Sequence, residues 1–412
     1  MKATGIIAEY NPFHKGHAYH IAKTREITGS DCIIVVMSGN FVQRGEPAIM
    51  DKYIRARAAL LNGADIVIEL PTVSAVGSSQ YFAAGSVGIL KHMQAEYLCF
   101  GSEAGEITPF LTASRLLSSR KPELDVLIHE FVKEGISYPL ARNRAIQDSE
   151  IANQLSVNEH AINLKELSAF FHLPNNILGL EYCMELERQN TVITPVTIKR
   201  TGGSYHETTL SGQFCSARAI RNAINAGETA FFNFLPENTH DSVKEYFSRY
   251  SPIFFDDFSD IVRFQLMKMN AESHHIADLP EFLQNKLRSL VKDTLSVTQL
   301  IEAAKSKDLT YTRISRALLH MILGITLQDY HALKENPCRY IRVLGLNKTG
   351  QAYLASIKKS LDCPLIVKPA DYKDYLSKDI FASDIYNLVL SRKSGCETIN
   401  DYRREIIKGL SV

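Results

Sequence analysis

The chain has 412 residues, which is enough for two or three domains. Hydrophobic residues make up 45% and charged residues 22%, with 22 Gly and 14 Pro, and this globular composition excludes a chain dominated by disorder or low complexity. The formal net charge of +1 excludes a general attraction to nucleic acids or membranes, so such a partner would need a local charged patch.

No segment predicts membrane insertion or export. The apolar run Cys32–Met37 is far too short to span a bilayer, and the N-terminus reaches Glu9 without a signal-peptide apolar region. We therefore expect a soluble, cytoplasmic protein with no membrane partner. The seven cysteines form no Cys-x-x-Cys pair, which indicates neither a disulfide framework nor a structural zinc, and we predict no metal site. Free thiols fit a reducing compartment.

Short apolar runs alternate with helical stretches over the first hundred residues, which is typical of βαβ units in a parallel, Rossmann-like α/β sheet. We expect strands at Gly5–Ala8, Cys32–Met37, Asp65–Leu70 and Tyr97–Phe100, and helices at Gly16–Ile27 and Asp51–Asn62. The first strand runs directly into residues 9–13. That loop lies at the carboxyl end of a central strand, where open α/β sheets place ligands.

The remainder of the chain predicts three further regions. Residues 105–190 are mostly helical, and Thr191–Lys199 forms a strand that returns to the sheet, so the first domain covers residues 1–236. Apolar residues at helical spacing predict an α-helical domain over 237–336. Strands at Tyr340–Leu344 and Pro364–Val367, with a helix between them, predict a small α/β C-terminal region over 337–412.

Positive charge is concentrated in the second half of the chain. Residues 284–360 contain 13 Lys plus Arg against 5 Asp plus Glu, which gives +8 and leaves −7 for the remainder. Such a segment could follow the phosphates of a folded nucleic acid, or it could be a solvated helix face. Tyr311, Tyr330 and Tyr340 are interleaved there, as stacking on bases would require.

The sharpest local signal is His14-Lys15-Gly16-His17, a His-x-Gly-His pattern between a buried strand and a helix. Imidazoles at i and i+3 share one helix face, and Gly16 allows the backbone to approach a ligand closely. The N–H groups of the first helical turn favour an anion. These features suit a nucleoside triphosphate whose phosphates are held while charge builds on leaving pyrophosphate. Surface histidines on a capped helix, or a metal pair helped by His20, are the alternatives.

This pattern resembles the signature of the His-x-Gly-His nucleotidyltransferase superfamily, and the whole chain resembles the bacterial tRNA(Met) cytidine acetate ligase family. The similarity is dense to about residue 221 and thinner afterwards. The matching stretches are Glu9–His17 (EYNPFHKGH), Met37–Ala48 (MSGNFVQRGEPA), Gly63–Pro71 (GADIVIELP), Phe100–Glu103 (FGSE), Pro174–Gly179 (PNNILG) and Leu309–Arg316 (LTYTRISR).

The resemblance implies a nucleotidyltransferase-type ATP site, with His14 and His17 as the catalytic residues. In this sequence the implied ATP-binding residues are Ile7, Ala8, Glu9, Tyr10, Asn11, Pro12, Phe13, His14, Lys15, Gly16, His17, Ala18, Tyr19, His20, Gly101, Asn175 and Arg200. The second superfamily element, a Ser/Thr-rich turn that ends in Arg and grips phosphates, matches residues 216–221, with Ser216 and Arg221 as ligands. A purely structural helix cap at Ser216 is the alternative.

Two other polar groups follow predicted strands. Gln43 and Arg44 lie in the loop after the second strand, where they could orient acetate or contact phosphate, or where Arg44 could pair with Glu46 in a rigid turn. Asp65 and Glu69 flank the third strand. We interpret these two carboxylates as strand ends that need solvation, with a general-base role as the alternative.

The implied activity is a ligase reaction that consumes ATP as co-substrate. Acetate becomes acetyl-adenylate with release of pyrophosphate, and the acetyl group passes to N4 of the wobble cytidine in elongator tRNA(Met), forming N4-acetylcytidine. Acetyl-CoA is not used, and Mg²⁺ is carried by the nucleotide. An adenylyltransferase acting on a small phosphate-bearing cofactor precursor, or a non-catalytic RNA-binding factor, are the alternatives.

The basic segment supplies the candidates for tRNA binding, which are Lys305, Lys307, Arg313, Arg316, Arg342 and Lys348. Arg313 and Arg316 are three residues apart on a predicted helix and share one face. The alternative is that these arginines pair with Glu302 or Asp308 on a solvated helix. The sequence carries no indication of an oligomeric state.

Overall fold

The computed structural model describes residues 1–119, 121–134, 141–142, 144–145, 173–200, 209–210, 212, 214–269 and 275–409. Part of the predicted helical stretch 105–190 lies outside these residues. Among the described residues, none of the helices combines the length and the apolar character needed to cross a membrane.

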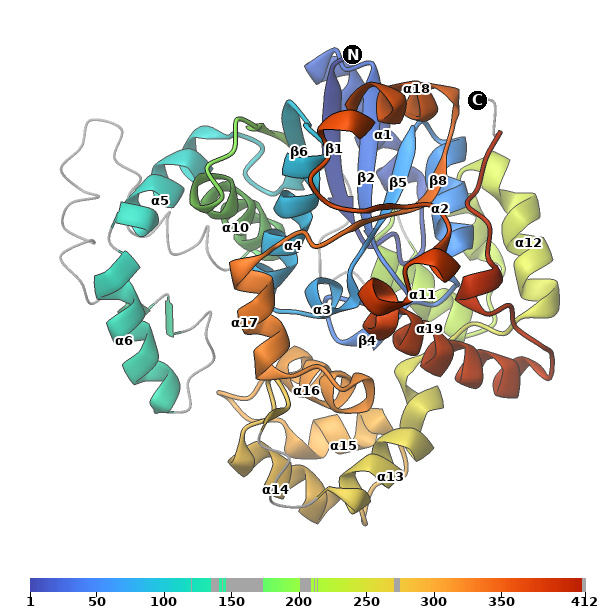
Figure 1. The fold of residues 1–412 in the computed structure, drawn as a ribbon. Helices are drawn as coiled ribbons and strands as arrows, with labels where there is room; N and C mark the ends of the chain where they lie inside the picture. Colours follow the sequence, from blue (N-terminus) through green and yellow to red (C-terminus); the bar gives the residue numbers. More distant parts are fainter. Residues whose placement is uncertain are drawn as a thin grey trace.

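A seven-stranded sheet forms the centre of the fold (Figure 1). Its strands, in the spatial order β7-β6-β1-β2-β5-β8-β9, are β7 (Thr194–Lys199), β6 (Tyr97–Ser102), β1 (Ala3–Ala8), β2 (Cys32–Ser38), β5 (Ile66–Leu70), β8 (Ile341–Leu346) and β9 (Leu365–Ile366). The strands from β7 to β5 pair in parallel, whereas β8 is antiparallel to β5. The predicted parallel α/β fold is therefore confirmed, and the five parallel strands of this sheet lie where the sequence predicted them.

Helices cover both faces of this sheet. The α-helices are α1 (Lys15–Thr28), α2 (Lys52–Leu61), α3 (Thr72–Ala75), α4 (Ser79–His92), α5 (Thr108–Ser119), α6 (Lys121–Lys133), α10 (Pro174–Arg188), α11 (Ala217–Asn225), α12 (His240–Arg249), α13 (Ser259–Lys268), α14 (Glu281–Leu290), α15 (Val297–Ala304), α16 (Tyr311–Leu323), α17 (Leu327–Glu335), α18 (Lys348–Ile357) and α19 (Lys373–Ser394). Alternate residues of β2 enter two different cores, with Ile34 facing α4 and α10 and Val35 facing α1 and α2. The period-2 alternation of a fully buried strand thus produces three layers.

The order of the strands creates a switch point between β1 and β6. From β1 the chain adds β2 and β5 on one side, and it later adds β6 and β7 on the other. Neighbouring loops at the carboxyl ends of β1 and β6 consequently diverge and leave a crevice, the usual ligand position in such sheets.

A helical region lies beyond this edge of the sheet (Figure 1). Helices α13 to α17 share one hydrophobic core with α11, α12 and part of α19, and this core also takes in Phe41 from the short strand β3 (Phe41–Val42). β3 pairs with β4 (Glu46–Pro47) in a hairpin between β2 and α2. Gly45 in its turn has φ +78, and a Cβ there would lie 2.4 Å from the backbone nitrogen of Arg316, so α16 packs directly on the hairpin.

The C-terminal region contributes to both the sheet and the helical core. Strands β8 and β9 extend the main sheet, and α19 instead packs its buried face into the helical core. The reason is burial: β8 is buried at all six positions, because β5 pairs with it on one side and β9 on the other. The division of the chain at residues 236 and 336 stays a prediction.

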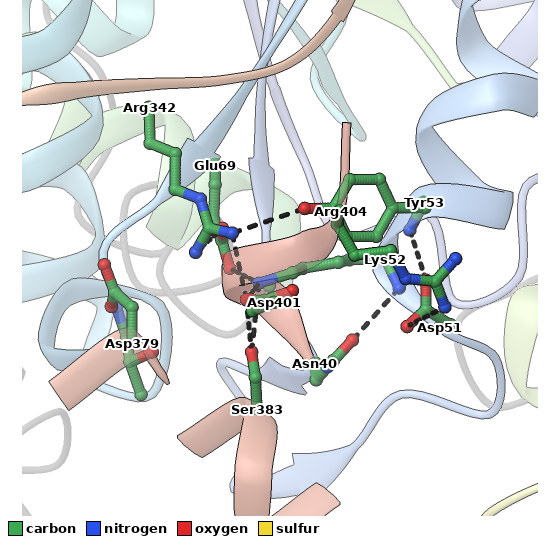
Figure 2. Close-up of polar contacts among 12 residues, drawn as sticks. Asn40, Asp51, Lys52, Tyr53, Glu69, Arg342, Asp379, Ser383, Asp401 and Arg404 are labelled. Carbon is green, nitrogen blue, oxygen red and sulfur yellow. Dashed lines mark hydrogen bonds and ion pairs between the residues drawn. The ribbon is translucent and has the colours of Figure 1, made fainter. Parts of the chain in front are cut away.

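A buried charge network fixes this C-terminal segment to the sheet (Figure 2). Lys52 at the start of α2 lies 2.7 Å from Glu69 on β5 and 2.6 Å from Asp401. Arg342 on β8 pairs with the same two carboxylates, at 2.9 Å each. Each of the four side chains is at most 4% exposed. The expectation that Glu69 needs solvation is therefore wrong, because two cations replace water around it.

We predict that Arg342→Met lowers the free energy of unfolding by about 3–5 kcal/mol, because it leaves two buried carboxylates against one cation. Urea denaturation followed by circular dichroism measures the effect. The control is Arg392→Met, which breaks an ion pair with Asp260 whose side chains are 71% and 68% exposed. That change should cost less than about 1 kcal/mol. Equal losses in the two variants would contradict the structural role assigned to the network.

Candidate active site

A cavity of about 300 Å³ lies at the switch point, at the carboxyl ends of β1 and β6. Fifteen of the nineteen residues implied for ATP line it, namely Ile7, Ala8, Glu9, Tyr10, Asn11, His14, Gly16, His17, Tyr19, His20, Gly101, Asn175, Arg200, Ser216 and Arg221. The other four, Pro12, Phe13, Lys15 and Ala18, do not line it. Phe13 instead packs in the core beneath α1.

The two histidines of the His-x-Gly-His motif are held by the backbone at the start of α1. The N–H of Gly16 donates to Nδ1 of His14 at 3.1 Å, and the N–H of His14 donates to Nδ1 of His17 at 3.2 Å. The two rings stack with centroids 3.7 Å apart. Because Nδ1 accepts in both neutral rings, the proton of each ring must be on Nε2. Each histidine therefore offers one N–H donor.

The surroundings keep these rings neutral. Burial, together with the positive charges of Arg200 and Arg221, lowers the pKa of His14 to about 3. Burial also lowers the pKa of His17 well below its ordinary value, with His14 and Arg200 adding to the effect. The pKa of His20 falls to about 4 for the same reasons, burial first and Arg200 second. Near neutral pH the rings act as hydrogen-bond donors rather than as cations.

Positive charge in the cavity comes from arginine and lysine instead. Among the residues that the structure describes, five cations line it, namely Arg44, Lys199, Arg200, Arg218 and Arg221, against the two carboxylates Glu9 and Glu46. The first turns of α1, α10 and α11 also contribute lining residues, so three helix N-termini border the same space. Helix N-termini and guanidinium groups both favour phosphate. The cavity is suited to a polyanion.

Ser216 and Arg221 come from α11, as the match to the second superfamily element predicted. Ser216 is the N-cap of α11, and its hydroxyl oxygen accepts from the N–H of Ala219 at 3.1 Å. Arg221 donates from Nη1 to the carbonyl of Asn11 at 2.8 Å, which ties α11 to the loop after β1. The helix cap that was the alternative for Ser216 is thus present, and because Ser216 also lines the cavity, its contact with a phosphate stays a prediction.

Two further motif segments meet beside the cavity. The carboxylate of Glu103, after β6, accepts from the side-chain amide of Asn175 at 2.6 Å and from the N–H of Asn176 at 2.9 Å. In return, Oδ1 of Asn176 accepts from the N–H of Glu103 at 3.1 Å. This exchange fixes Asn175 at the start of α10. A Cβ on neighbouring Gly101 would lie 3.3 Å from the side chain of Arg200, so glycine keeps that wall open.

The opposite wall comes from the hairpin between β3 and β4. Gln43, Arg44 and Glu46 all line the cavity, and the N–H of Gln43 donates to Oε1 of Glu9 at 2.9 Å. The N–H of Gly45 donates to the carbonyl of Val42 at 2.9 Å, which closes a tight turn, and contacts of Gln43 and Arg44 with acetate or phosphate stay predictions. The apolar lining was not anticipated from the sequence; it includes Phe82, Phe100, Leu178, Tyr182, Ile198 and Phe214. These side chains come from five separate elements and loops and share no local pattern.

The predicted tRNA contacts do not form one surface. Lys305 and Lys307 are exposed in the turn between α15 and α16, although Lys305 lies 3.5 Å from Glu302. Arg316 is held by Asp278 at 3.0 Å. Lys348 is exposed at the start of α18, which follows β8 and lies at the edge of the sheet away from the cavity (Figure 1).

The prediction that Arg342 contacts tRNA is wrong. Its side chain is 1% exposed and forms ion pairs with Glu69 and Asp401 inside the fold. The guanidinium group therefore cannot contact a phosphate at the surface. Arg313 is half-buried at the first turn of α16.

Comparisons with known proteins agree with this geometry. A family model described as HIGH Nucleotidyl Transferase matches residues 1–400. The chain is 38% identical to a tRNA(Met) cytidine acetate ligase of Clostridium kluyveri, over 94% of this chain and 95% of the relative. It is 37% identical to the ligase of that name from Clostridium acetobutylicum, over 99% and 100% of the two chains.

Two crystal structures of Thermotoga maritima TmcAL are also similar. The apo form has a TM-score of 0.90 at 30% identity, and the form bound with alpha-thio ATP has a TM-score of 0.88 at 29% identity. Each comparison covers 99% of both chains.

We predict that His14→Asn makes stability less sensitive to acid. The pKa of His14 falls from an ordinary 6.5 to about 3 on folding. The unfolded chain therefore binds this proton first as the pH falls. The neutral ring therefore contributes its full share of the free energy of unfolding above about pH 6.5. That contribution is lost as the pH falls from about 6.5 to about 3, the pKa values of His14 in the unfolded and folded chain.

Asn retains an acceptor for the N–H of Gly16 but does not titrate. Between about pH 7 and about pH 4, the urea midpoint of the variant should fall less than that of the unsubstituted protein. Replacement of the exposed His331 by Asn controls for the loss of a histidine elsewhere. Parallel pH profiles for His14→Asn and the unsubstituted protein would show that His14 is not held neutral by the fold.

Proposed function

Because the chain belongs to the tRNA(Met) cytidine acetate ligase family, we propose that it activates acetate with ATP and transfers the acetyl group to N4 of the wobble cytidine in elongator tRNA(Met). The observation that carries this proposal is the pair of neutral Nε2–H donors on His14 and His17 in a cavity lined by five cations. This combination serves a reaction in which negative charge builds on phosphate oxygens.

In the first step, a carboxylate oxygen of acetate forms a bond to the α-phosphorus of ATP. The bond from that phosphorus to the bridging β-oxygen breaks, and pyrophosphate leaves with the electron pair. The reaction requires positioning and charge stabilisation rather than a nucleophile on the protein. His14 and His17 are suited to donate to phosphate oxygens, and Arg200, Arg218 and Arg221 to balance the charge of pyrophosphate.

In the second step, the N4 amine of the cytidine attacks the acetyl carbonyl carbon. The bond to the AMP oxygen breaks, AMP leaves, and the amine loses one proton. Acetyl-CoA takes no part in this scheme. Of the described carboxylates on the cavity wall, Glu9 accepts a hydrogen bond from the N–H of Gln43, and Glu46 lies 3.9 Å from the guanidinium of Arg221. Mg²⁺ would therefore arrive bound to the nucleotide.

The tRNA would approach the cavity over the first turn of α16. Ser315 on this helix donates to the carbonyl of Gly45 at 2.9 Å, and the neighbouring hairpin residues Gln43 and Arg44 line the cavity. The turn that carries Lys305 and Lys307 directly precedes α16. A phosphate backbone that crosses this turn could therefore continue to the hairpin wall of the cavity.

The test is incubation of the protein with ATP, radiolabelled acetate and total tRNA, followed by nucleoside analysis. We expect AMP, pyrophosphate and labelled N4-acetylcytidine. Acetyl-CoA without ATP should give no labelled nucleoside. Product from acetyl-CoA alone, or adenylation of a small phosphate-bearing acceptor in place of acetate, would overturn the proposal.

We predict that His14→Ala combined with His17→Ala abolishes acetate-dependent formation of AMP and pyrophosphate. Loss of one such donor commonly reduces kcat by about 10² to 10³. A pyrophosphate-release assay measures the effect, with circular dichroism to check folding. Lys23→Ala lies on the same helix, outside the cavity lining, and breaks a partly exposed pair with Glu26, so it should retain full activity. Equal activity in the double variant and this control would contradict the catalytic assignment.

We predict that replacing Lys305, Lys307 and Arg313 by Ala weakens tRNA binding. Each lost phosphate contact should reduce the log-log slope of affinity against salt by about 0.7 to 0.9. Filter binding at several salt concentrations measures both quantities. Lys358→Ala with Lys359→Ala removes exposed charge just beyond α18, and it should leave affinity and slope unchanged. The opposite pattern would place the RNA on the α18 side.

A further inference from the structure

Three metal-binding side chains converge outside the ATP cavity. His92 is the last residue of α4, Cys338 precedes β8, and Cys363 precedes β9. One possible ligand atom from each lies within 4.8 Å of the other two. These residues line a second cavity of about 400 Å³, together with Asp362 and Arg339. The spacing of the cysteines in the sequence gave no sign of this cluster, because the fold brings together residues from distant segments.

The distances suit a tetrahedral ion. The two sulfur atoms are 4.0 Å apart, close to the ~3.8 Å edge of a tetrahedron with metal–sulfur bonds of ~2.3 Å. A disulfide would instead require the sulfur atoms to approach to about 2.05 Å, and it would give His92 and Asp362 no part. The observed separation is that of two thiols in contact, and an ion could bind between them with little movement of either sulfur.

The histidine is already oriented as a ligand. Nδ1 of His92 lies 2.8 Å from the carbonyl oxygen of Gly88, and since a carbonyl can only accept, Nδ1 carries the proton. Nε2, the other ring nitrogen, lies 3.1 Å from a carboxylate oxygen of Asp362, a contact in which a bound cation would take the place of a proton. Metal-binding histidines usually donate their other N–H to a backbone carbonyl in this way.

We propose that His92, Cys338 and Cys363 bind a zinc ion, with Asp362 beside the fourth, solvent-facing position. Two thiolates and an imidazole favour Zn²⁺ over Mg²⁺ or Ca²⁺, which prefer oxygen ligands. The side chain of Asp362 is 79% exposed, so the fourth position opens to solvent and the ion has a path of entry. Arg339, on the same cavity, offsets the negative charge that two thiolates and a carboxylate add.

The role of such an ion would be structural. It would join the end of α4 to the segments that enter β8 and β9, which form the outer edge of the sheet. The ligands are absent from the lining of the ATP cavity. The proposal is therefore independent of the acetate ligase activity, and metal binding rather than catalysis is its readout.

The experiment uses the full-length protein, stripped with a chelator, reduced and titrated with Co²⁺. We expect one equivalent to bind with a thiolate-to-cobalt charge-transfer band and the visible bands of tetrahedral cobalt, and Zn²⁺ to displace it. Cys338→Ser with Cys363→Ser should abolish the charge-transfer band and weaken Zn²⁺ binding by more than about 100-fold, beyond the effect of losing an outer-shell partner. Asp362→Asn should retain that band with weaker binding.

Cys396→Ser is the matched control, because this thiol lies beyond the end of α19 and contacts the carbonyl of Arg249. It should leave the cobalt spectrum and the Zn²⁺ affinity unchanged. Thermal unfolding of the unsubstituted protein gives a second measurement. Free Zn²⁺ at about 100 times its Kd should favour the folded state about 100-fold and raise Tm.

Three results would overturn the proposal: a cobalt spectrum without the charge-transfer band, unchanged Zn²⁺ affinity in the double serine variant, or a Tm that does not respond to Zn²⁺. Mass spectrometry of the untreated protein adds a further criterion. A loss of two hydrogens that maps to Cys338 and Cys363 would identify a disulfide in place of the zinc site.

Discussion

Four buried charges join the N-terminal part of the sheet to the C-terminal segment. Lys52 and Arg342 face Glu69 and Asp401 in an environment with almost no access to water (Figure 2). An isolated charge in such a place costs several kcal/mol, so each member is tolerable only when the others are present. The network therefore ties α2, β5 and β8 to the C-terminal segment that contains Asp401. Ser383 on α19 adds a hydrogen bond to that carboxylate at 2.9 Å.

The same helix that carries Lys52 also positions the walls of the ATP cavity. The N–H of Lys52 donates to the side chain of Asn40 at 3.0 Å. One turn later, Arg55 is fully buried and donates to the carbonyls of Glu9 and Ser38 at 2.7 and 3.0 Å, and also to Gly39. The carbonyls of Glu9 and Gly39 belong to the loops that follow β1 and β2, and that of Ser38 belongs to the last residue of β2. Helix α2 is thus held by the charge network at Lys52, and its hydrogen bonds from Arg55 hold the backbone of the loops around the candidate site.

The sheet and the centre of the candidate site were predictable because their signals are local. The continuous apolar run Cys32–Met37 and a His-x-Gly-His motif at a strand-to-helix junction can each be identified within a few residues. The failures concern contacts between distant segments. Arg342 contributes to a basic segment when charges are counted, yet its partners Glu69 and Asp401 lie in other parts of the sequence. A charge count contains no information on which charged side chains are buried. The spacing of cysteines in the sequence contains no information on which strands become neighbours in the sheet.

Directional donors and positive charge are supplied by different residues in the ATP cavity. The rings of His14 and His17 stack with centroids 3.7 Å apart, so protonating both would place two cations in contact inside the fold. Backbone N–H groups hold both Nδ1 atoms as acceptors, which leaves a neutral N–H donor on each ring. Arg200 and Arg221 lie close enough to lower the pKa of His14, and they supply the charge that the rings lack. A phosphate group that entered the cavity would offset those same charges. The arrangement can therefore meet an anion with fixed donors before any proton has moved.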